Sequence, residues 1–186
     1  MDKRSARLEL SITNLFPKLL SSIFFDPLTL LVDKGSDFKN LIFLLKHSIL
    51  TKMFLNDFTA LDHPYLIRRF ELRYQLLSYL MNVRFSLQRR VYSRAYSVDN
   101  LFASANWLER EVWDMFGVVF IKNTKEIRRI LTDYGFQGFP LRKDFPVTGF
   151  FQVRYSEKKK RLIYFPLRVA EVSSKIARNV DNTNFE

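Results

Sequence analysis

Three carboxylates lie close together in the stretch Ala105–Phe116, namely Glu109, Glu111 and Asp114. Paired carboxylates serve general acid–base catalysis and bind divalent cations. The stretch is predicted to be helical, and positions two apart on a helix point to nearly opposite sides. Glu111 and Asp114 share a face, and Arg110 is spaced to pair with Asp114 along the surface. We therefore interpret the cluster as an ionic network that fixes the helix, with a catalytic pair as the alternative.

The sequence has few other residues or motifs that could serve in catalysis. The 186 residues include no cysteine and only two histidines, His47 and His63. Without cysteine the chain forms no disulfide, thiolate zinc site, iron–sulfur ligation or cysteine nucleophile. Neither of the glycine-rich phosphate-binding motifs occurs, and no Ser–His–acid grouping is indicated. A freestanding hydrolase or transferase is thus the third hypothesis, which turnover by the isolated chain would revive.

The charge balance is strongly basic, with thirty Lys and Arg against nineteen Asp and Glu, a net charge of +11. An anionic partner is therefore expected: nucleic acid, lipid headgroups or an acidic protein. The runs Arg89–Arg90 and Lys158–Arg161 could contact phosphates. The basic residues are otherwise scattered, and no RNA-binding motif with aromatics on strands is found. An RNA-binding or ribosomal component remains the alternative function.

Alternating apolar residues predict the strands. Phe70–Tyr79 and Val83–Arg90 alternate with the period of half-buried strands and should form an antiparallel pair. Leu55–Leu61 should continue that sheet, and Leu28–Val32 is a short candidate strand. With 47% hydrophobic residues, the chain has enough apolar side chains for a core.

Helix signals flank these strands. A helix is predicted from Ser36, as its cap, to His47. A second is predicted over Ser97–Gly117, with Ser97 as N-cap and Gly117 ending it in left-handed geometry. Gly149–Tyr155 and Arg161–Phe165 should form a hairpin. We expect an α+β fold with a small antiparallel or mixed sheet, packing helices and a long irregular C-terminal arm. The expected division is residues 1–121 as the core and 122–186 as a partner-binding arm.

The most unusual stretch is Ile127–Pro146, which cannot form regular structure. Two glycines and two prolines make the chain turn repeatedly, and its aromatics would form an adhesive patch if all were exposed. They either pack beneath the domain itself or anchor the segment between partners. In the second case its charged residues fix its position through charge-assisted bonds. We favour the second interpretation, a component of a permanent assembly.

Two sequence blocks resemble one family: "ANWLEREVWDMFGVVF" at 105–120 and "RRILTDYGFQGFPLRKDFPVTGF" at 128–150. Both are similar to the 30 kDa, or C, subunit of proton-pumping NADH:ubiquinone oxidoreductase, respiratory complex I. Weaker similarity in "LNDFTALDHP" and "RFELRYQLLSYLMNVR" extends it over most of residues 40–165. The chain departs from the family at Phe139, where the family has His, and in "NTKEIRR" before the second block.

The resemblance implies a scaffold subunit of the peripheral arm, which carries electrons from NADH to ubiquinone. This chain would have no catalytic residues and no cofactor, because FMN and the iron–sulfur clusters are held by partner subunits. Its neighbours would be the large quinone-site subunit and the ferredoxin-like iron–sulfur subunits, without nucleic acid. The expected partner-contact residues are Glu109, Arg110, Glu111, Asp114, Asp133, Tyr134, Phe136, Phe139, Arg142, Lys143 and Asp144.

Location is predicted from composition together with the resemblance. No apolar run reaches the length of a membrane-spanning helix. The opening sixteen residues are a poor transit or signal peptide, and nineteen Phe are typical of an AT-rich organellar gene. We expect the matrix side of the mitochondrial inner membrane and an organelle-encoded chain, with the bacterial cytoplasmic membrane face as the alternative.

Overall fold

The computed structural model describes residues 23–25, 28–32, 35–47, 52–80, 82–121, 123 and 127–167. The chain divides into two compact units, Met1–Arg142 and Lys143–Glu186. This division falls well after the boundary at 121/122 that the sequence suggested, because residues 127–142 bond to the first unit. The apolar segment before Ile23 and the polar tail after Leu167 lie outside the described residues.

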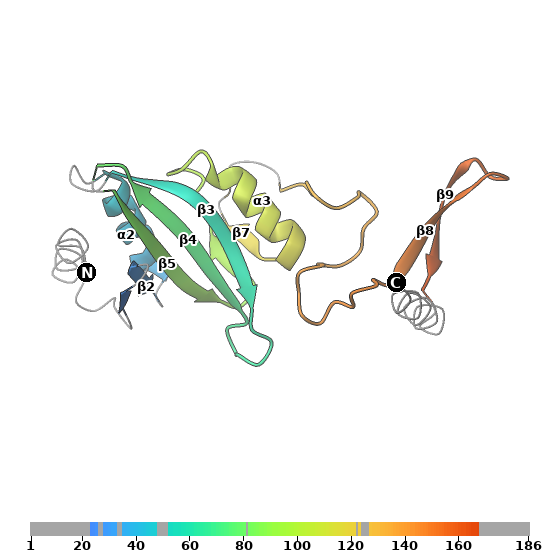
Figure 1. Cartoon of the computed structure of the whole chain (residues 1–186), viewed down its shortest axis with the longest axis horizontal. Coiled ribbons are helices and arrows are strands. Elements are labelled where there is room, and N and C mark those ends of the chain that lie inside the picture. The colour runs from blue at the N-terminus through green and yellow to red at the C-terminus, as the bar shows by residue number, and fades with distance from the viewer. Residues whose placement is uncertain are drawn as a thin grey trace, which may run out of the picture. The chain divides into compact units, whose positions relative to one another are not determined.

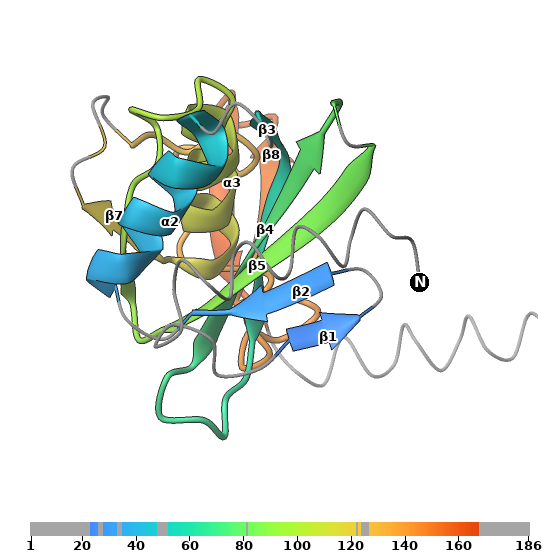
Figure 2. The ribbon, with the colours of Figure 1, turned by 90° about the vertical axis from the view of Figure 1, so that its left-hand side faces the viewer.

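The first unit contains a five-stranded mixed sheet, in the order β1-β2-β5-β4-β3 (Figures 1 and 2). Its strands are β1 (Ile23–Phe25), β2 (Leu28–Leu31), β3 (Met53–Asp62), β4 (Phe70–Ser78) and β5 (Val83–Val91). β3, β4 and β5 pair antiparallel, whereas β2 runs parallel to β5. The predicted antiparallel strands and the α+β class are confirmed.

Two helices, α2 (Gly35–His47) and α3 (Ala105–Phe116), cover one face of this sheet (Figure 2). The face is apolar because β4 and β5 place alternate side chains on it. Tyr74 of β4 lies at its centre, with its ring 5.0 Å from that of Phe38 and 4.3 Å from that of Phe58. Among the described residues, no helix has the length and apolar composition needed to cross a membrane.

The predicted helix starts were wrong. α3 begins after Ser104 rather than at Ser97, because the Ser97 hydroxyl accepts the Asp99 N–H (3.1 Å) and stabilises a turn instead of a helix. α2 already includes Ser36, so this residue is not its cap. The predicted end of α3 is confirmed: Gly117 has φ 75° and donates its N–H to the Trp113 carbonyl (2.8 Å).

Two smaller pairs of strands complete the described chain. In the first unit, β6 (Arg94–Tyr96) pairs in parallel with β7 (Val119–Ile121) and joins the two ends of the segment that contains α3. In the second unit, β8 (Phe151–Ser156) and β9 (Arg161–Pro166) form the predicted antiparallel hairpin around a charged turn.

Candidate functional site

The Asp114 carboxylate is the centre of a buried network of hydrogen bonds. It is fully buried, with 0% exposure, on the side of α3 that faces the irregular segment. Oδ2 accepts the backbone N–H groups of Ile130 (3.2 Å), Leu131 (2.9 Å) and Thr132 (3.1 Å). Oδ1 accepts the Thr132 hydroxyl (2.6 Å) and pairs with Arg129 Nη1 (2.8 Å). One carboxylate thus satisfies the donors of a whole turn that forms no regular structure.

The hydrogen bonds decide the protonation of Asp114. Burial on its own raises the pKa of this carboxyl, because a buried charge loses its hydration. The bonds from the Thr132 hydroxyl and from the N–H groups of Leu131, Thr132 and Ile130 favour the charged form and outweigh burial. The resulting pKa is about 2. Asp114 is therefore an anion at any physiological pH.

Arg129, the partner of that carboxylate, also organises the aromatic residues nearby. It donates to the Gly138 carbonyl (3.3 Å). Its guanidinium carbon lies 5.6 Å from the ring of Trp113 and 5.8 Å from the rings of Phe136 and Phe139. Guanidinium groups are attracted to aromatic faces at such distances. Arg129 is not among the residues predicted from the sequence, although the pair Arg128–Arg129 near the start of the irregular stretch offered a signal.

The predicted pair between Arg110 and Asp114 is wrong. Arg110 instead donates Nε to the Arg128 carbonyl (3.3 Å) and stacks near the Trp107 ring (5.8 Å). A spacing of four residues favours pairing only where both side chains lie on the helix surface, and Asp114 points inward. The more general prediction, an ionic network that fixes this helix against another segment, is confirmed with Arg129 as the cation.

Glu109 is the second buried carboxylate of α3, also with 0% exposure. It accepts the Val98 N–H (2.7 Å) and the Asn123 side-chain N–H (3.0 Å). Burial raises the pKa of Glu109 to about 7, against the lowering effect of the bond from Val98. Glu109 and Asp114 therefore hold different loops, and their bonds do not converge on a common substrate position.

The other end of the irregular segment docks on the end of α3. Arg142 donates Nε to the Phe116 carbonyl (2.6 Å) and lies 4.3 Å from the Phe139 ring and 5.3 Å from the Phe70 ring. A Cβ on Gly117 would meet the Arg142 guanidinium and approach the Phe139 ring to 2.7 Å. Glycine is thus required here for space as well as for its positive φ. We call residues 127–142 the docked segment.

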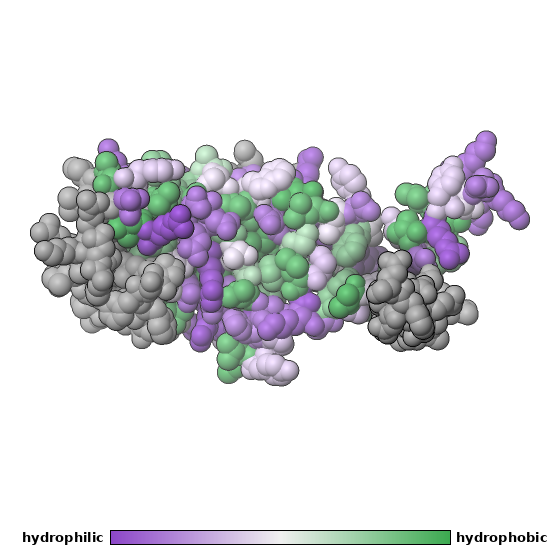
Figure 3. Space-filling model, in the orientation of Figure 1, coloured by the Kyte–Doolittle hydropathy of each residue, from purple (hydrophilic) through white to green (hydrophobic). Residues whose placement is uncertain are grey.

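The first interpretation of the irregular aromatics, packing beneath the domain itself, is confirmed in part, and anchoring between partners stays a prediction. Phe136 and Phe139 are partly buried, with their rings near the Arg129 guanidinium, whereas Tyr134 is fully exposed at 101%. Leu131 and Leu141 also point outward, and hydrophobic surface lies over this part of the unit (Figure 3). Of the other expected contact residues, Asp133 is exposed, and Lys143 and Asp144 are exposed in the second unit.

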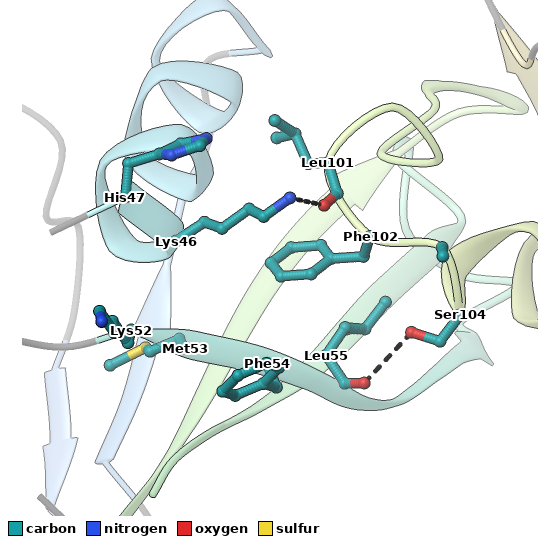
Figure 4. Close-up of a pocket in the computed structure, with 10 residues that line it drawn as sticks. Lys46, His47, Lys52, Met53, Phe54, Leu55, Leu101, Phe102 and Ser104 are labelled. Atoms are coloured by element: carbon teal, nitrogen blue, oxygen red, sulfur yellow. Dashed lines mark hydrogen bonds between the residues drawn. The ribbon is translucent and has the colours of Figure 1, made fainter. Parts of the chain in front are cut away.

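A cavity of about 520 Å³ opens between the end of α2, the start of β3 and the loop before α3 (Figure 4). Lys46 reaches across it to donate to the Leu101 carbonyl, and the Ser104 hydroxyl donates to the Leu55 carbonyl (3.3 Å). These polar side chains thus tie one part of the backbone to another. Across the described residues, no group of three or more His, Cys, Asp or Glu is placed to hold a metal ion.

The fold and these networks define an α+β domain that bonds an irregular aromatic segment onto its second helix through buried charges. The chain belongs to the family described as the 30 kDa subunit of respiratory-chain NADH dehydrogenase, whose profile matches residues 32–151. The match confirms the resemblance seen in the sequence. It favours a respiratory subunit over the RNA-binding alternative.

Individual relatives support membership of this family. The chain is 49% identical over 144 residues to NADH-ubiquinone oxidoreductase subunit 9 of Acanthamoeba castellanii, covering 76% of this chain and 72% of the relative. It is 48% identical over 136 residues to NADH dehydrogenase [ubiquinone] iron-sulfur protein 3 of Arabidopsis thaliana, covering 72% and 71%. Among solved structures, it resembles a trypsin-resistant fragment (1-134) of Nqo5, with 30% identity and a TM-score of 0.54, covering 64% of this chain and 99% of the fragment.

Proposed function

We propose that this chain is a cofactor-free structural subunit of the peripheral arm of proton-pumping NADH:ubiquinone oxidoreductase. It holds the quinone-reducing module in a fixed register, so that the distances between electron carriers stay constant during turnover. The observation that carries the proposal is the docked segment. It is fixed from beneath by Asp114 and Arg129 and presents Tyr134, Leu131 and Leu141 outward. Tyrosine is enriched among the residues that contribute most to binding at protein interfaces.

The chemistry of the chain supports a role without bound carriers. The sequence has no cysteine to ligate an iron–sulfur cluster. Both buried carboxylates of α3, Glu109 and Asp114, accept hydrogen bonds from backbone N–H groups of this same chain. FMN and the clusters therefore belong to partner subunits in this proposal.

The hairpin of the second unit supports a permanent assembly. Its register places one set of apolar side chains on a single face, where each is about half exposed. These residues are Phe151, Val153, Tyr155, Leu162 and Tyr164. An isolated two-stranded ribbon is only marginally stable in water. A partner that covers this apolar face would stabilise it.

The partners that we propose are the large quinone-site subunit and the ferredoxin-like iron–sulfur subunits. Direct contacts come from the exposed members of the predicted set, chiefly Asp133, Tyr134, Lys143 and Asp144. Glu109 and Asp114 act indirectly, because they hold loops of the chain in place. The proposed location is the matrix side of the mitochondrial inner membrane, with the gene in the organelle. Curated relatives from an amoeba and from plants support it.

Arg142 offers the test. Arg142→Ala removes the bond to the Phe116 carbonyl and the contact with Phe139. We expect the amount of assembled enzyme to fall several-fold, while NADH:ubiquinone turnover per assembled enzyme stays unchanged. A native gel stained for NADH dehydrogenase, with peptide identification of the stained band, measures both. Arg84→Ala, at an exposed position of β5, is the matched control. Normal abundance with slowed electron transfer would contradict the proposal.

A further inference from the structure

The turn between β3 and β4 exposes apolar side chains at its tip. Tyr65 is 99% exposed and Ile67 is 86% exposed, with Leu66 also exposed between them. The turn projects beyond the end of the sheet, and hydrophobic surface lies on one side of its tip, beside surface of intermediate hydropathy, with hydrophilic surface at its base (Figures 1 and 3). Soluble chains rarely leave contiguous apolar groups at a projecting point unless a partner covers them. We call residues 63–69 the finger.

The finger is held in one shape by its own base. Arg69 makes a two-pronged ion pair with the buried Asp62, with Nε to Oδ1 at 2.6 Å and Nη2 to Oδ2 at 2.8 Å. The His63 N–H donates to the Arg69 carbonyl (2.9 Å), and the Leu66 N–H donates to the His63 carbonyl (3.0 Å). A loop that is already ordered loses little conformational entropy on binding. The exposed apolar tip is therefore presented in a rigid form.

Basic side chains outnumber acidic ones in the finger and at its base, and we call this group the collar. Buried Glu71 accepts Arg73 Nε (2.8 Å) and lies within 3.7 Å of Arg90 Nε and 3.5 Å of His63 Nε2. The finger and its base carry four arginines, the fourth being exposed Arg68, against the carboxylates of Asp62 and Glu71. The collar is thus net positive. Charge complementarity calls for a partner surface that is acidic around its apolar centre.

The base of the finger and the end of the docked segment contact the same buried aromatic ring. The Phe70 ring, at the start of β4, lies 5.4 Å from the guanidinium of Arg69 and 5.3 Å from that of Arg142. One aromatic ring is therefore held between the base of the finger and the end of the docked segment. A partner that covers the docked segment would lie within reach of the finger.

We infer that the finger is a second docking element, which inserts Tyr65 and Ile67 into an apolar groove rimmed by carboxylates on another subunit of the same enzyme. This inference rests on the proposed function. A protein groove fits better than a lipid surface, because the apolar tip is small and rigid and combines a tyrosine with neighbouring arginines, two residue types enriched at interface hot spots. Binding at a lipid surface depends on a much longer apolar face.

The test is a double substitution, Tyr65→Ser with Ile67→Ser, made in the full chain within the native enzyme. Both side chains are exposed, so the thermal midpoint of the isolated chain should not change. The amount of assembled enzyme that survives a salt wash should fall about tenfold or more, as for the loss of hot-spot residues. The matched control is Tyr79→Ser with Leu80→Ser, exposed at the opposite turn of the same sheet. An equal loss in the control, or no loss in the finger variant, would overturn the inference.

A photo-crosslinking side chain at position 67 identifies what covers the finger. The expected product joins position 67 to a peptide of another enzyme subunit, and Arg68→Glu should reduce its yield several-fold. A crosslink to lipid or to a second copy of this chain would overturn the inference. If Arg142→Ala lowers assembly but the finger variant assembles normally, only the finger inference fails. If neither variant lowers assembly, the proposed function fails as well.

Discussion

The docked segment and the β8–β9 hairpin follow one another in the chain, but their apolar side chains are buried to different extents. In the docked segment, the aromatics nearest α3 pack around Arg129, whose charge is paired with buried Asp114. In the hairpin, the apolar residues of one face are each about half exposed. The segment without regular structure therefore covers its aromatic side chains better than the hairpin does. The regular hairpin leaves its apolar surface open.

The difference shows what stabilises irregular backbone. A segment without helix or strand bonds must find other acceptors for its N–H groups, and Asp114 supplies them for Ile130, Leu131 and Thr132. The hairpin satisfies its backbone by pairing its own strands but has no second layer within its described unit. The docked segment is therefore part of the folding unit of the domain, and the proposed function leaves the apolar face of the hairpin to a partner.

The largest expected effect comes from Asp114→Ala, which should leave the docked segment, like the hairpin, without buried contacts to a second layer. It deletes the acceptor for the turn and leaves Arg129 as an unpaired, largely buried cation. We expect the free energy of unfolding to fall by about 3–5 kcal/mol. Urea unfolding gives the value, and amide exchange at residues 130–132 should become fast. Asp133→Ala, at an exposed neighbouring position, should change stability by less than about 0.5 kcal/mol. A loss below about 1 kcal/mol in the Asp114 variant would mean that the docked segment is held by its aromatics alone.

A somewhat smaller effect is expected from Glu109→Gln, and it depends on pH. The folded-state pKa of about 7 lies above the ordinary value of 4.5. The stabilisation from proton binding is therefore fully present below about pH 4.5 and is lost as the pH rises through 7. Between pH 5 and pH 8 the variant should gain about 2.5 kcal/mol relative to the parent chain. Urea unfolding at the two pH values measures this. Parallel profiles for the two chains would rule out Glu109 as the titrating group.

The smallest effect on folding is expected on the hairpin. Tyr164→Asp places a charge on the exposed apolar face and should change the stability of the first unit by less than about 0.5 kcal/mol. Incorporation into the enzyme should nevertheless fall several-fold, because a charge buried without a partner is costly in an interface. Arg154→Asp, on the opposite face of the same ribbon, is the control. Equal incorporation of the two variants would show that the apolar face is not the covered one.

Local pattern predicted much of the fold. The alternation in Phe70–Ser78 was sufficient for β4, because every second residue of that strand faces the core. Gly117 marked the end of α3 for a similar local reason. The start of α3 was missed, because Ser97 and Ser104 are both acceptable caps by sequence. In the structure the Ser97 hydroxyl accepts the Asp99 N–H in a turn, and the Ser104 hydroxyl donates to the Leu55 carbonyl on β3 instead of capping the helix.

The sequence by itself determined the strand periods, the end of α3, the lack of thiolate ligands and membership of a family. These features depend on neighbouring residues or on composition, and such signals can be read along the chain. Tertiary structure alone decided that Asp114 pairs with Arg129 rather than Arg110. It also brought Arg69 and Arg142 to one aromatic ring. The physical reason is that a buried charge selects its partner by position in space and by the number of donors it can gather, and sequence spacing does not encode either.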